Sequence, residues 1–330
     1  MIAEKTVLIL GAGASKPFGF PTGTELKKQI CLELLNSNGD IYNIIENLQV
    51  KQFVKDLKQS RFDSVDAFLE AKPKYEIIGK QAIAAILLQK EAQNESLLLK
   101  SGDWYQSLFN ILTKDCKSFD SIRDNKITIL TYNYDRTLEY YLFTKLSSLD
   151  KTDQEIKDVL ENLNIIHLHG SLGKLPWQGG EYQFNYTKFK FKGNINNRAY
   201  RDAIADQQDT AIAIKRTKLF TVHKAAMDAN EIKIIYEVEL NGNLQFQNAI
   251  QALREAENVY FFGFGFSKTN LERLDYMNWN NLRRCAGTTY GINAQTKELL
   301  KNISFGEARL RFEPYEITCY DFLSDVAIFK

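Results

Sequence analysis

The side chains best suited to chemistry lie in two short polar motifs, each of which follows an apolar segment. TYNYD, Thr131 to Asp135, follows ITIL, and HLHGS, which contains His169, follows NII. The amide of Asn133 can hold a water molecule or a sugar hydroxyl. A histidine titrates close to neutrality, with a reference pKa of about 6.5, so His169 suits a general base that deprotonates a hydroxyl. The two motifs together predict a site for positioning and proton transfer.

Each motif also has a simpler interpretation. An Asn or Asp before RTLEYYL can cap that helix, a role that suits Asp135 better than Asn133, which lies farther from the helix. His167 and His169 share one face of a strand and could be metal ligands. No carboxylate or cysteine joins them locally, and the four cysteines lie far apart without a CxxC pair. We therefore predict no bound metal.

A first glycine-rich segment, GAGAS from Gly11 to Ser15, could hold a pyrophosphate. Its small residues let the backbone approach the ligand closely, and a following helix N-terminus favours an anion. Lys16 stands where a dehydrogenase-type GxGxxG has its third glycine, and Pro17 interrupts a helix. We therefore expect the loop to run on through FGFPTG before a helix forms. A tight turn would explain the glycines without any ligand.

A second glycine-rich segment is FFGFGFSKTN. Gly263 and Gly265 end a late strand, while Ser267 and Asn270 offer hydrogen bonds to a ribose or a base. A sharp turn is again the simpler interpretation of the glycines.

Buried strands and amphipathic helices alternate around these motifs. Continuous apolar segments predict strands at Thr6–Leu10, in KITILTYN, in NIIHLHG and in ENVYFFG. Helical spacing follows in RTLEYYLFTKL and precedes the last of these strands in LQFQNAIQALREA, and AGTTYGINAQTKELLKNI suggests one more strand and helix. ARLRFEPYEI could add a final strand. The pattern predicts an α/β protein with an open, doubly wound, mostly parallel, Rossmann-like sheet.

A long segment of helical spacing, about residues 24–120, separates the first two strands and predicts a helical insertion within a single domain of residues 1–330. A helix should begin near Thr24. Farther along, EYQFNYTKFKFKG alternates aromatic with polar residues, as an edge strand or hairpin does. Its lysines and aromatic rings could also contact nucleic acid, although a solvated edge strand explains them better.

The overall charge gives no reason to expect a polyanionic partner. Lysine plus arginine (42) nearly balance aspartate plus glutamate (41), so we expect no direct contact with nucleic acid and no attachment to a membrane. The apolar part of MIAEKTVLILGAGAS is too short to span a membrane, and glycines follow it instead of a signal-peptide cleavage site. We expect a cytoplasmic protein.

The ordered set GAGAS, TYNYD, HGS and a late glycine-rich strand end resembles the sirtuin-like fold, in which TYNYD matches a Thr-x-Asn-x-Asp motif. The set is most similar to the sirtuin-like NAD hydrolases of bacterial anti-phage defence systems. SVDAFLEAKPKYEIIGKQAIAAIL also resembles the helical region of that group. The likeness spans nearly the whole chain.

The resemblance implies that Asn133 and His169 are the catalytic pair and that glycine-rich segments hold NAD, which is the substrate. Asp135 would lie on the ribose or nicotinamide side. The implied NAD-binding residues, carried over motif by motif, are Gly11, Ala12, Gly13, Ser15, Pro21, Thr22, Asp135, Gly170, Ser171, Gly263, Gly265, Ser267 and Asn270.

The implied activity is cleavage of the nicotinamide–ribose bond of NAD, which yields nicotinamide and ADP-ribose or a cyclised form and depletes NAD in defence. A homo-oligomer and a partner such as a DNA translocase are implied as well. Protein deacylation is an alternative, but deacylating sirtuins have two CxxC pairs and an Asp-Phe-Arg after Gly-x-Pro, whereas this chain has no CxxC and reads GFPTGTEL. A regulatory subunit that senses NAD or ADP-ribose without turnover is a further alternative.

Overall fold

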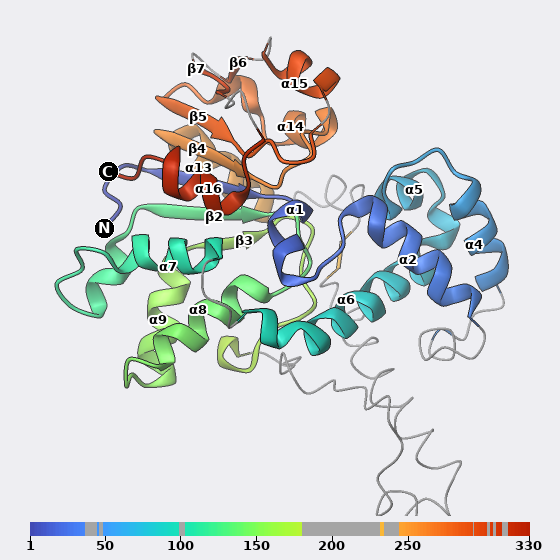
Figure 1. Ribbon diagram of the computed structural model, residues 1–330, viewed down its shortest axis with the longest axis horizontal. Coiled ribbons are helices and arrows are strands. Elements are labelled where there is room, and N and C mark those ends of the chain that lie inside the picture. The colour runs from blue at the N-terminus through green and yellow to red at the C-terminus, as the bar shows by residue number, and fades with distance from the viewer. Residues whose placement is uncertain are drawn as a thin grey trace, which may run out of the picture. The chain divides into compact units, whose positions relative to one another are not determined.

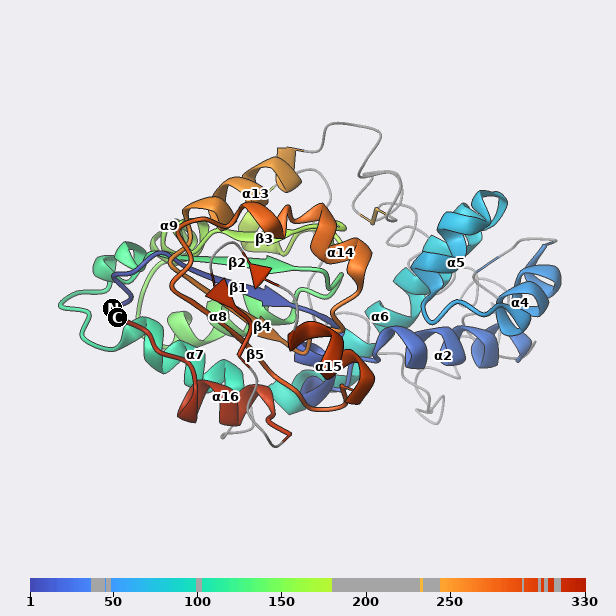
Figure 2. The same cartoon turned by 90° about the horizontal axis from the view of Figure 1, so that it is seen from above.

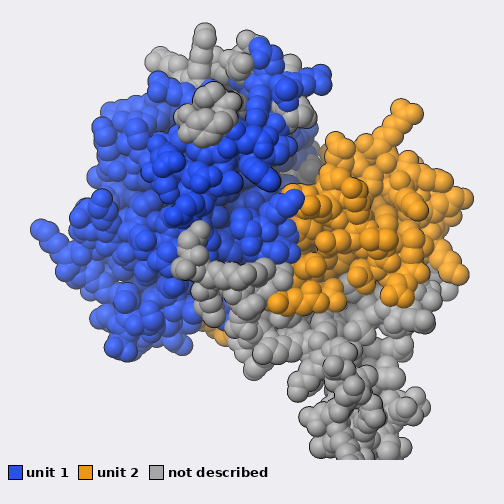
Figure 3. Space-filling view, viewed as in Figure 1, with its two compact units in different colours: residues 1–20, 96–169, 238–330 blue, residues 21–95, 170–237 orange. Residues whose placement is uncertain are grey.

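The computed structural model describes residues 1–36, 45, 49–98, 103–179, 232–233, 244–292, 294–301, 304–305, 308–311 and 316–330. The chain divides into two compact units, which Figure 3 distinguishes by colour. The first unit contains residues 1–20, 96–169 and 238–330, and the second contains residues 21–95 and 170–237. Each unit is therefore assembled from segments that are distant in the sequence.

A parallel five-stranded sheet forms the centre of the first unit (Figure 1). The strand order is β3-β2-β1-β4-β5. The strands are β1 (Thr6–Leu10), β2 (Ile127–Thr131), β3 (Ile165–His167), β4 (Asn258–Phe262) and β5 (Arg284–Gly287). Every residue of β1 and β4 is buried, as expected for parallel strands covered on both faces. The predicted α/β fold with a mostly parallel sheet is confirmed.

Helices pack on both faces of this sheet, as Figure 2 shows. On one face, Val7, Ile9 and Phe261 share an apolar core with Phe246 and Leu253 of α13. On the opposite face, the ring of Phe262 lies 5.4 Å from Trp104 of α7 and 5.3 Å from Phe322 of α16. Successive residues of one strand, such as Phe261 and Phe262, thus point to opposite cores. The helices of this unit are α7 (Trp104–Thr113), α8 (Thr137–Ser147), α9 (Asp153–Asn162), α13 (Leu244–Glu255), α14 (Lys268–Arg273), α15 (Ala294–Lys301) and α16 (Cys319–Asp325).

The short strands β6 (Ser304–Phe305) and β7 (Ala308–Arg309) form an antiparallel pair near the end of the chain. Beyond β7, Arg311 makes an isolated parallel bridge to Ala286 of β5. The extended structure expected in ARLRFEPYEI is therefore present, and within the described residues Arg311 joins it to β5 of the main sheet.

The turn after β1 corrects one expectation from the sequence. A helical turn, α1 (Ala12–Ser15), begins directly after Gly11 and continues as a 3-10 turn over Lys16–Phe18. Pro17 does not interrupt it, because proline at the start of a helical turn has no hydrogen bond to lose and already has a helical φ. Gly19, at φ 83°, then ends the turn in the left-handed conformation that glycine adopts without strain.

The second unit is mostly helical in its first segment, whereas residues 170–179 contain a 3-10 turn at Pro176–Gln178 and an isolated antiparallel bridge from Gly170 to Ile232. Its helices are α2 (Gly23–Leu35), α4 (Val50–Gln59), α5 (Val65–Ala71) and most of α6 (Glu76–Leu98), with a 3-10 turn at Pro73–Tyr75. The helix expected near Thr24 is α2, which begins at Gly23. Rings of Phe53, Phe68 and Tyr75 lie 5.5–6.0 Å apart and form an aromatic core between these helices.

EYQFNYTKFKFKG, predicted to be an edge strand or hairpin, lies outside the described residues. Among the helices that the structure describes, none is long and apolar enough to cross a membrane. The boundaries of the helical insertion stay a prediction.

Candidate active site

The candidate site lies where the strand order of the sheet changes direction. The chain leaves β1 toward β2 and β3 on one side, while β4 and β5 lie on the other side. In open parallel sheets, ligands bind at the carboxyl ends of the strands at such a point. Thr131 at the end of β2 pairs with His167 at the end of β3. Asn133 and His169 therefore each follow this pair by two residues, on adjacent strands.

The side chain of Asn133 is fixed by the turn after β1. Its amide Nδ2 donates hydrogen bonds to the carbonyl oxygen of Gly11 (3.0 Å) and to Ser15 Oγ (2.9 Å). Because the Gly11 carbonyl can only accept, these bonds define which atom of the amide is nitrogen. The remaining atom, Oδ1, has no hydrogen-bond partner among the described residues. Asn133 therefore presents a fixed acceptor that is available to a ligand.

Asp135 is almost fully buried behind this amide. Its Oδ1 accepts a hydrogen bond from the backbone N–H of Thr137 (3.2 Å), so it assists the N-terminus of α8, as its position before that helix suggested. Burial raises the pKa of Asp135, and hydrogen bonds from Thr137 and Ser15 only partly oppose this rise. Ser15 thus links the amide of Asn133 to the carboxyl group of Asp135.

His167 holds the backbone of Asn133. Its Nδ1 lies 2.9 Å from the carbonyl oxygen of Asn133, and its Nε2 lies 2.5 Å from Oε1 of Glu139 in α8. Both partners are acceptors, so both ring nitrogens act as donors and the ring is an imidazolium ion. Burial opposes this charge, but the Glu139 carboxylate, together with Asn133 and Asp135, outweighs burial and raises the pKa of His167. With both nitrogens engaged, His167 has no lone pair for a metal.

His169 has the opposite environment. It is 5% exposed, and its ring lies 5.1 Å from Tyr132 in an edge-to-face arrangement and 6.4 Å from Phe246. Burial, helped by the cation of Arg273, lowers the pKa of His169 to about 3, so the ring is neutral near neutral pH. The expectation that His169 titrates close to neutrality is therefore corrected, because the buried ring has lost the solvation that its charged form needs. Its Nε2 is buried and has no hydrogen-bond partner among the residues that the structure describes. Such an orphaned polar atom is costly in a folded protein and often marks a functional site.

A second orphaned atom lies in α14, near the glycine-rich end of β4. The Oδ1 atom of Asn270 is buried and has no partner in the described part of the chain, while the backbone carbonyl of the same residue accepts a hydrogen bond from Tyr132 Oη at 3.1 Å. Tyr132 therefore connects the end of β2, next to His169, to α14. In the described part of the chain, no group of three His, Cys, Asp or Glu side chains is placed to hold a metal ion.

Three of the predicted glycines are required by the contact between two loops. A Cβ atom on Gly11 would lie 2.6 Å from the carbonyl oxygen of Gly263, and one on Gly13 would lie 2.8 Å from the Cα atom of Gly263. A Cβ atom on Gly263 itself, which has φ +53°, would lie 2.1 Å from the backbone nitrogen of Ala14. Gly265 differs, because it is exposed and its Cβ direction is open. Packing therefore explains the first three glycines but not Gly265.

The other predicted ligand-binding residues are divided between the two units. Ser267 is exposed at the N-cap of α14, and its side chain makes no capping hydrogen bond. Pro21, Thr22, Gly170 and Ser171 belong to the second unit. There, the hydroxyl and backbone N–H of Thr22 both bond to the Glu25 carboxylate in the capping box of α2.

The sequence did not reveal the role of Glu139 or the division of labour between the two histidines. Glu139 lies inside the helix predicted at RTLEYYLFTKL, away from the strand ends where polar site residues were sought. The one feature of the sequence that could have indicated a role for Glu139 was the presence of a carboxylate among the apolar residues of LEYYLF. His167 was considered only as a metal ligand.

A comparison with protein families finds a match that includes this part of the chain. Residues 127–275 match the family model described as a SIR2-like domain. The matched region extends from the start of β2 to just beyond α14, so it contains Asn133, His169 and the loop after β4. A comparison with curated proteins finds no significant match. The matched region and the helix-flanked parallel sheet support a sirtuin-like family for this chain, and SIR2-like domains are typically NAD-dependent enzymes.

Proposed function

We propose that the protein is an NAD hydrolase that cleaves the bond between nicotinamide and ribose and releases nicotinamide and ADP-ribose. The observation that carries the proposal is the pair of unsatisfied polar atoms on residues that follow adjacent strand ends. Oδ1 of Asn133 has no hydrogen-bond partner in the described residues, and Nε2 of His169 is a buried atom without one. A bound hydroxyl group or water molecule would satisfy them.

The residues present suit NAD as a substrate. The orphaned Oδ1 atom of Asn270 could accept a hydrogen bond from a sugar hydroxyl or an amide. Gly265, in the loop between β4 and α14, has open space beside it. Arg273 acts electrostatically on His169, so a cation lies close to the site and would attract a phosphate-bearing ligand. These groups complement the hydroxyls and phosphates of a dinucleotide.

The neutral state of His169 suits this reaction. Cleavage of the bond gives the ribose an oxocarbenium-like positive charge, and nicotinamide leaves as a neutral molecule that needs no proton. An imidazolium beside this charge would repel it, whereas a neutral imidazole would not. His169 would then accept a proton from a ribose hydroxyl or from the attacking water, and that water adds to the ribose in place of nicotinamide.

Asn133 would orient the ribose or the attacking water through Oδ1. The hydrogen bonds from its amide to Gly11 and Ser15 fix the direction of this oxygen, and the His167 imidazolium holds its backbone. His167 and Glu139 are therefore positioning residues.

The test is incubation of the purified chain with NAD alone, followed by timed chromatography. We expect release of nicotinamide and ADP-ribose, and we expect Asn133→Ala to reduce the rate about a hundredfold or more, because misplaced reactants lose at least that factor. Wild-type turnover in this variant would remove Asn133 from the mechanism. Release that requires an acylated peptide would indicate a deacylase, and tight NAD binding without release would indicate a sensing subunit.

A biological role in anti-phage defence is part of this proposal, supported by the resemblance of the ordered motifs to defence-associated hydrolases. In this role the enzyme would act in the cytoplasm as a homo-oligomer. A partner protein such as a DNA translocase would control when NAD is cleaved. Measuring cellular NAD during phage challenge, with wild type and with Asn133→Ala, tests it. Equal NAD levels in the two strains would contradict the role.

A further inference from the structure

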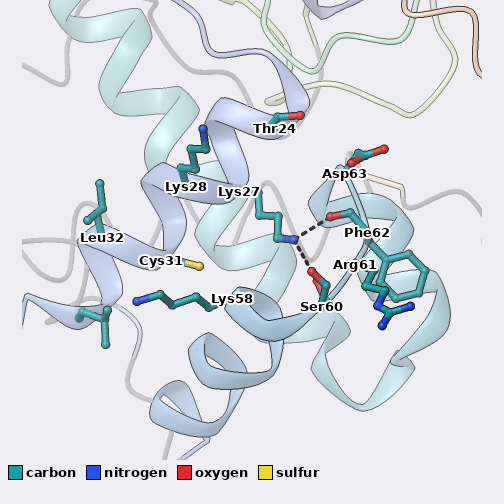
Figure 4. Close-up of a pocket in the computed structure, with 11 residues that line it drawn as sticks. Thr24, Lys27, Lys28, Cys31, Leu32, Lys58, Ser60, Arg61, Phe62 and Asp63 are labelled. Carbon is teal, nitrogen blue, oxygen red and sulfur yellow. Dashed lines mark hydrogen bonds between the residues drawn. The ribbon is translucent and has the colours of Figure 1, made fainter. Parts of the chain in front are cut away.

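The second unit contains a pocket that has no part in the chemistry described above. It lies between α2, the C-terminal end of α4 and the loop that follows α4 (Figure 4), and it encloses about 460 Å³. Pockets that bind small molecules usually have volumes of about 300–1,000 Å³. The pocket is therefore large enough for a small organic ligand.

The charge of the pocket is strongly unbalanced. Lys27, Lys28, Lys58 and Arg61 line it, together with a single acid, Asp63. The Lys27 ammonium is held by the carbonyl oxygens of Ser60 (3.1 Å) and Phe62 (2.7 Å), so its charge has a fixed position.

The other three cations have no fixed partner within the described ranges of the chain. Lys28, Lys58 and Arg61 make no ion pair with any residue that the structure describes. Figure 4 shows the Lys58 side chain reaching from α4 toward α2, beside Cys31. Cations left unpaired around one hollow create a positive potential that attracts anions.

Apolar side chains occupy the same pocket. Leu32 is 69% exposed, Leu35 is 57% exposed and Phe62 is 38% exposed, which places three of the exposed large apolar residues of the described chain in one small area. A solvated basic helix surface needs no such residues. The combination fits a ligand with an anionic end and an apolar or aromatic body.

We propose that this pocket binds a small phosphorylated molecule of the nucleotide class. Lys28, Lys58 and Arg61 contact the phosphates, and Leu32, Leu35 and Phe62 contact the base or another apolar body. Phosphate is favoured over a single carboxylate because it carries about −1.5 to −2 charges and three acceptor oxygens, which match several cations. None of these six residues belongs to the proposed NAD site, and the proposal does not depend on NAD cleavage.

The experiment titrates the full-length protein with ATP by calorimetry. The pocket variant is Lys28→Glu with Lys58→Glu, and the matched control is Lys51→Glu with Lys55→Glu, which makes the same charge change at exposed α4 positions outside the pocket. We expect the pocket variant to bind ATP about tenfold more weakly, or weaker still, at this site, which equals a loss of about 1.4 kcal/mol of binding free energy. The control variant should bind ATP about as tightly as wild type. Equal affinities in all three proteins, or equal losses in both variants, would overturn the proposal.

A second comparison tests the apolar contact. Leu32→Ser should weaken the binding of ATP but not of inorganic tripolyphosphate, because only ATP has a base that can contact the leucine side chain. An unchanged ATP affinity would show that no apolar group is recognised and would overturn the assignment to nucleotides. NAD cleavage is measured on the same samples without ATP, where all variants should match wild type. Failure of the pocket assignment is thereby distinguished from failure of the proposed NAD cleavage.

Discussion

The two histidines of HLHGS have opposite protonation states because their neighbours differ. His167 faces a carboxylate and a carbonyl oxygen, whereas His169 is surrounded by Tyr132 and Phe246 and lies near a cation. Burial opposes charge in both rings, and only His167 has acceptors that compensate. Two residues of one type, two positions apart, therefore have different functions.

The neutral state of His169 predicts an unusual dependence on pH. Its imidazole should remain neutral at pH 5, well below the usual histidine pKa of about 6.5. The contribution of neutral His169 to the free energy of unfolding is fully present above pH 6.5 and is lost as pH falls toward 3, because between these values only the unfolded state binds the proton. Between pH 7 and 5 the wild type should lose up to about 2 kcal/mol more stability than His169→Phe. Urea unfolding at both pH values measures this, and an equal loss in both proteins would show that His169 titrates normally.

The ion pair between His167 and Glu139 predicts an alkaline limit to activity. Glu139→Gln should lower the pKa of His167, since the carboxylate is the strongest of the groups that raise it. The contribution of His167 to stability is present below its unfolded pKa and is lost as pH rises through its raised folded pKa. In the variant, the fall in kcat should therefore begin at lower pH, with a smaller change in KM. Glu161→Gln, in an exposed ion pair of α9, is the control and should keep the wild-type profile.

At the scale of elements, the contact between the turn after β1 and the loop after β4 determines the shape of the site. The backbone N–H of Gly13 donates to the carbonyl oxygen of Gly263 at 3.0 Å, and the N–H of Gly263 donates to Thr288 Oγ1 at 2.8 Å. Side chains at Gly11, Gly13 or Gly263 would separate the loops. This contact also places Gly11 where its carbonyl oxygen can accept from Asn133.

Substitutions at two glycines separate packing from ligand binding. Gly263→Ala should destabilise the protein by roughly 2 kcal/mol or more, because its Cβ atom would overlap the backbone of Ala14 and its φ of +53° is strained for alanine. Gly265→Ala meets nothing within 4 Å, so its melting temperature should stay near wild type. A raised KM for NAD in Gly265→Ala would then report on binding alone. Equal melting temperatures for both variants would contradict the close contact between the loops.

Periodicity predicted the elements of the first unit well, because parallel strands buried on both faces leave long apolar segments such as TVLIL and VYFF. The prediction that Pro17 interrupts the helical turn after Gly11 was wrong, because local propensity says little about a proline that can begin a new 3-10 turn. The strand-end positions of Asn133 and His169 could be predicted. The unpaired Nε2 and the ion pair with Glu139 could not, since they depend on contacts between segments distant in the sequence.

At the scale of the whole molecule, the chain passes between the two units directly next to the candidate base. His169 is the last residue of one segment of the first unit, and Gly170, at φ 75°, begins a segment of the second unit. Glycine adopts this left-handed conformation without strain. The turn that follows the catalytic candidate is therefore also a connection between units.

Removal of metal should leave activity unchanged. Both nitrogens of His167 are engaged, His169 stands alone among aromatic rings, and all four cysteines are free thiols, three of them buried. Treatment with a chelator, followed by the NAD assay and elemental analysis, provides the measurement. One tightly held zinc ion per chain, together with loss of turnover, would contradict this expectation and favour a deacylase-like site.

The central position of β1 has a consequence for how the protein is made. Thr6 pairs with Ile127 on one side and with Asn258 on the other, so both partners of the first strand lie far along the chain. A ribosome adds about 5–20 residues per second, so β2 follows β1 by roughly 6–24 seconds and β4 follows it by roughly 13–50 seconds. During this interval an apolar strand has two open edges, which are sites for aggregation. The duration of synthesis, rather than the strength of any one contact, therefore determines how long the nascent chain needs protection.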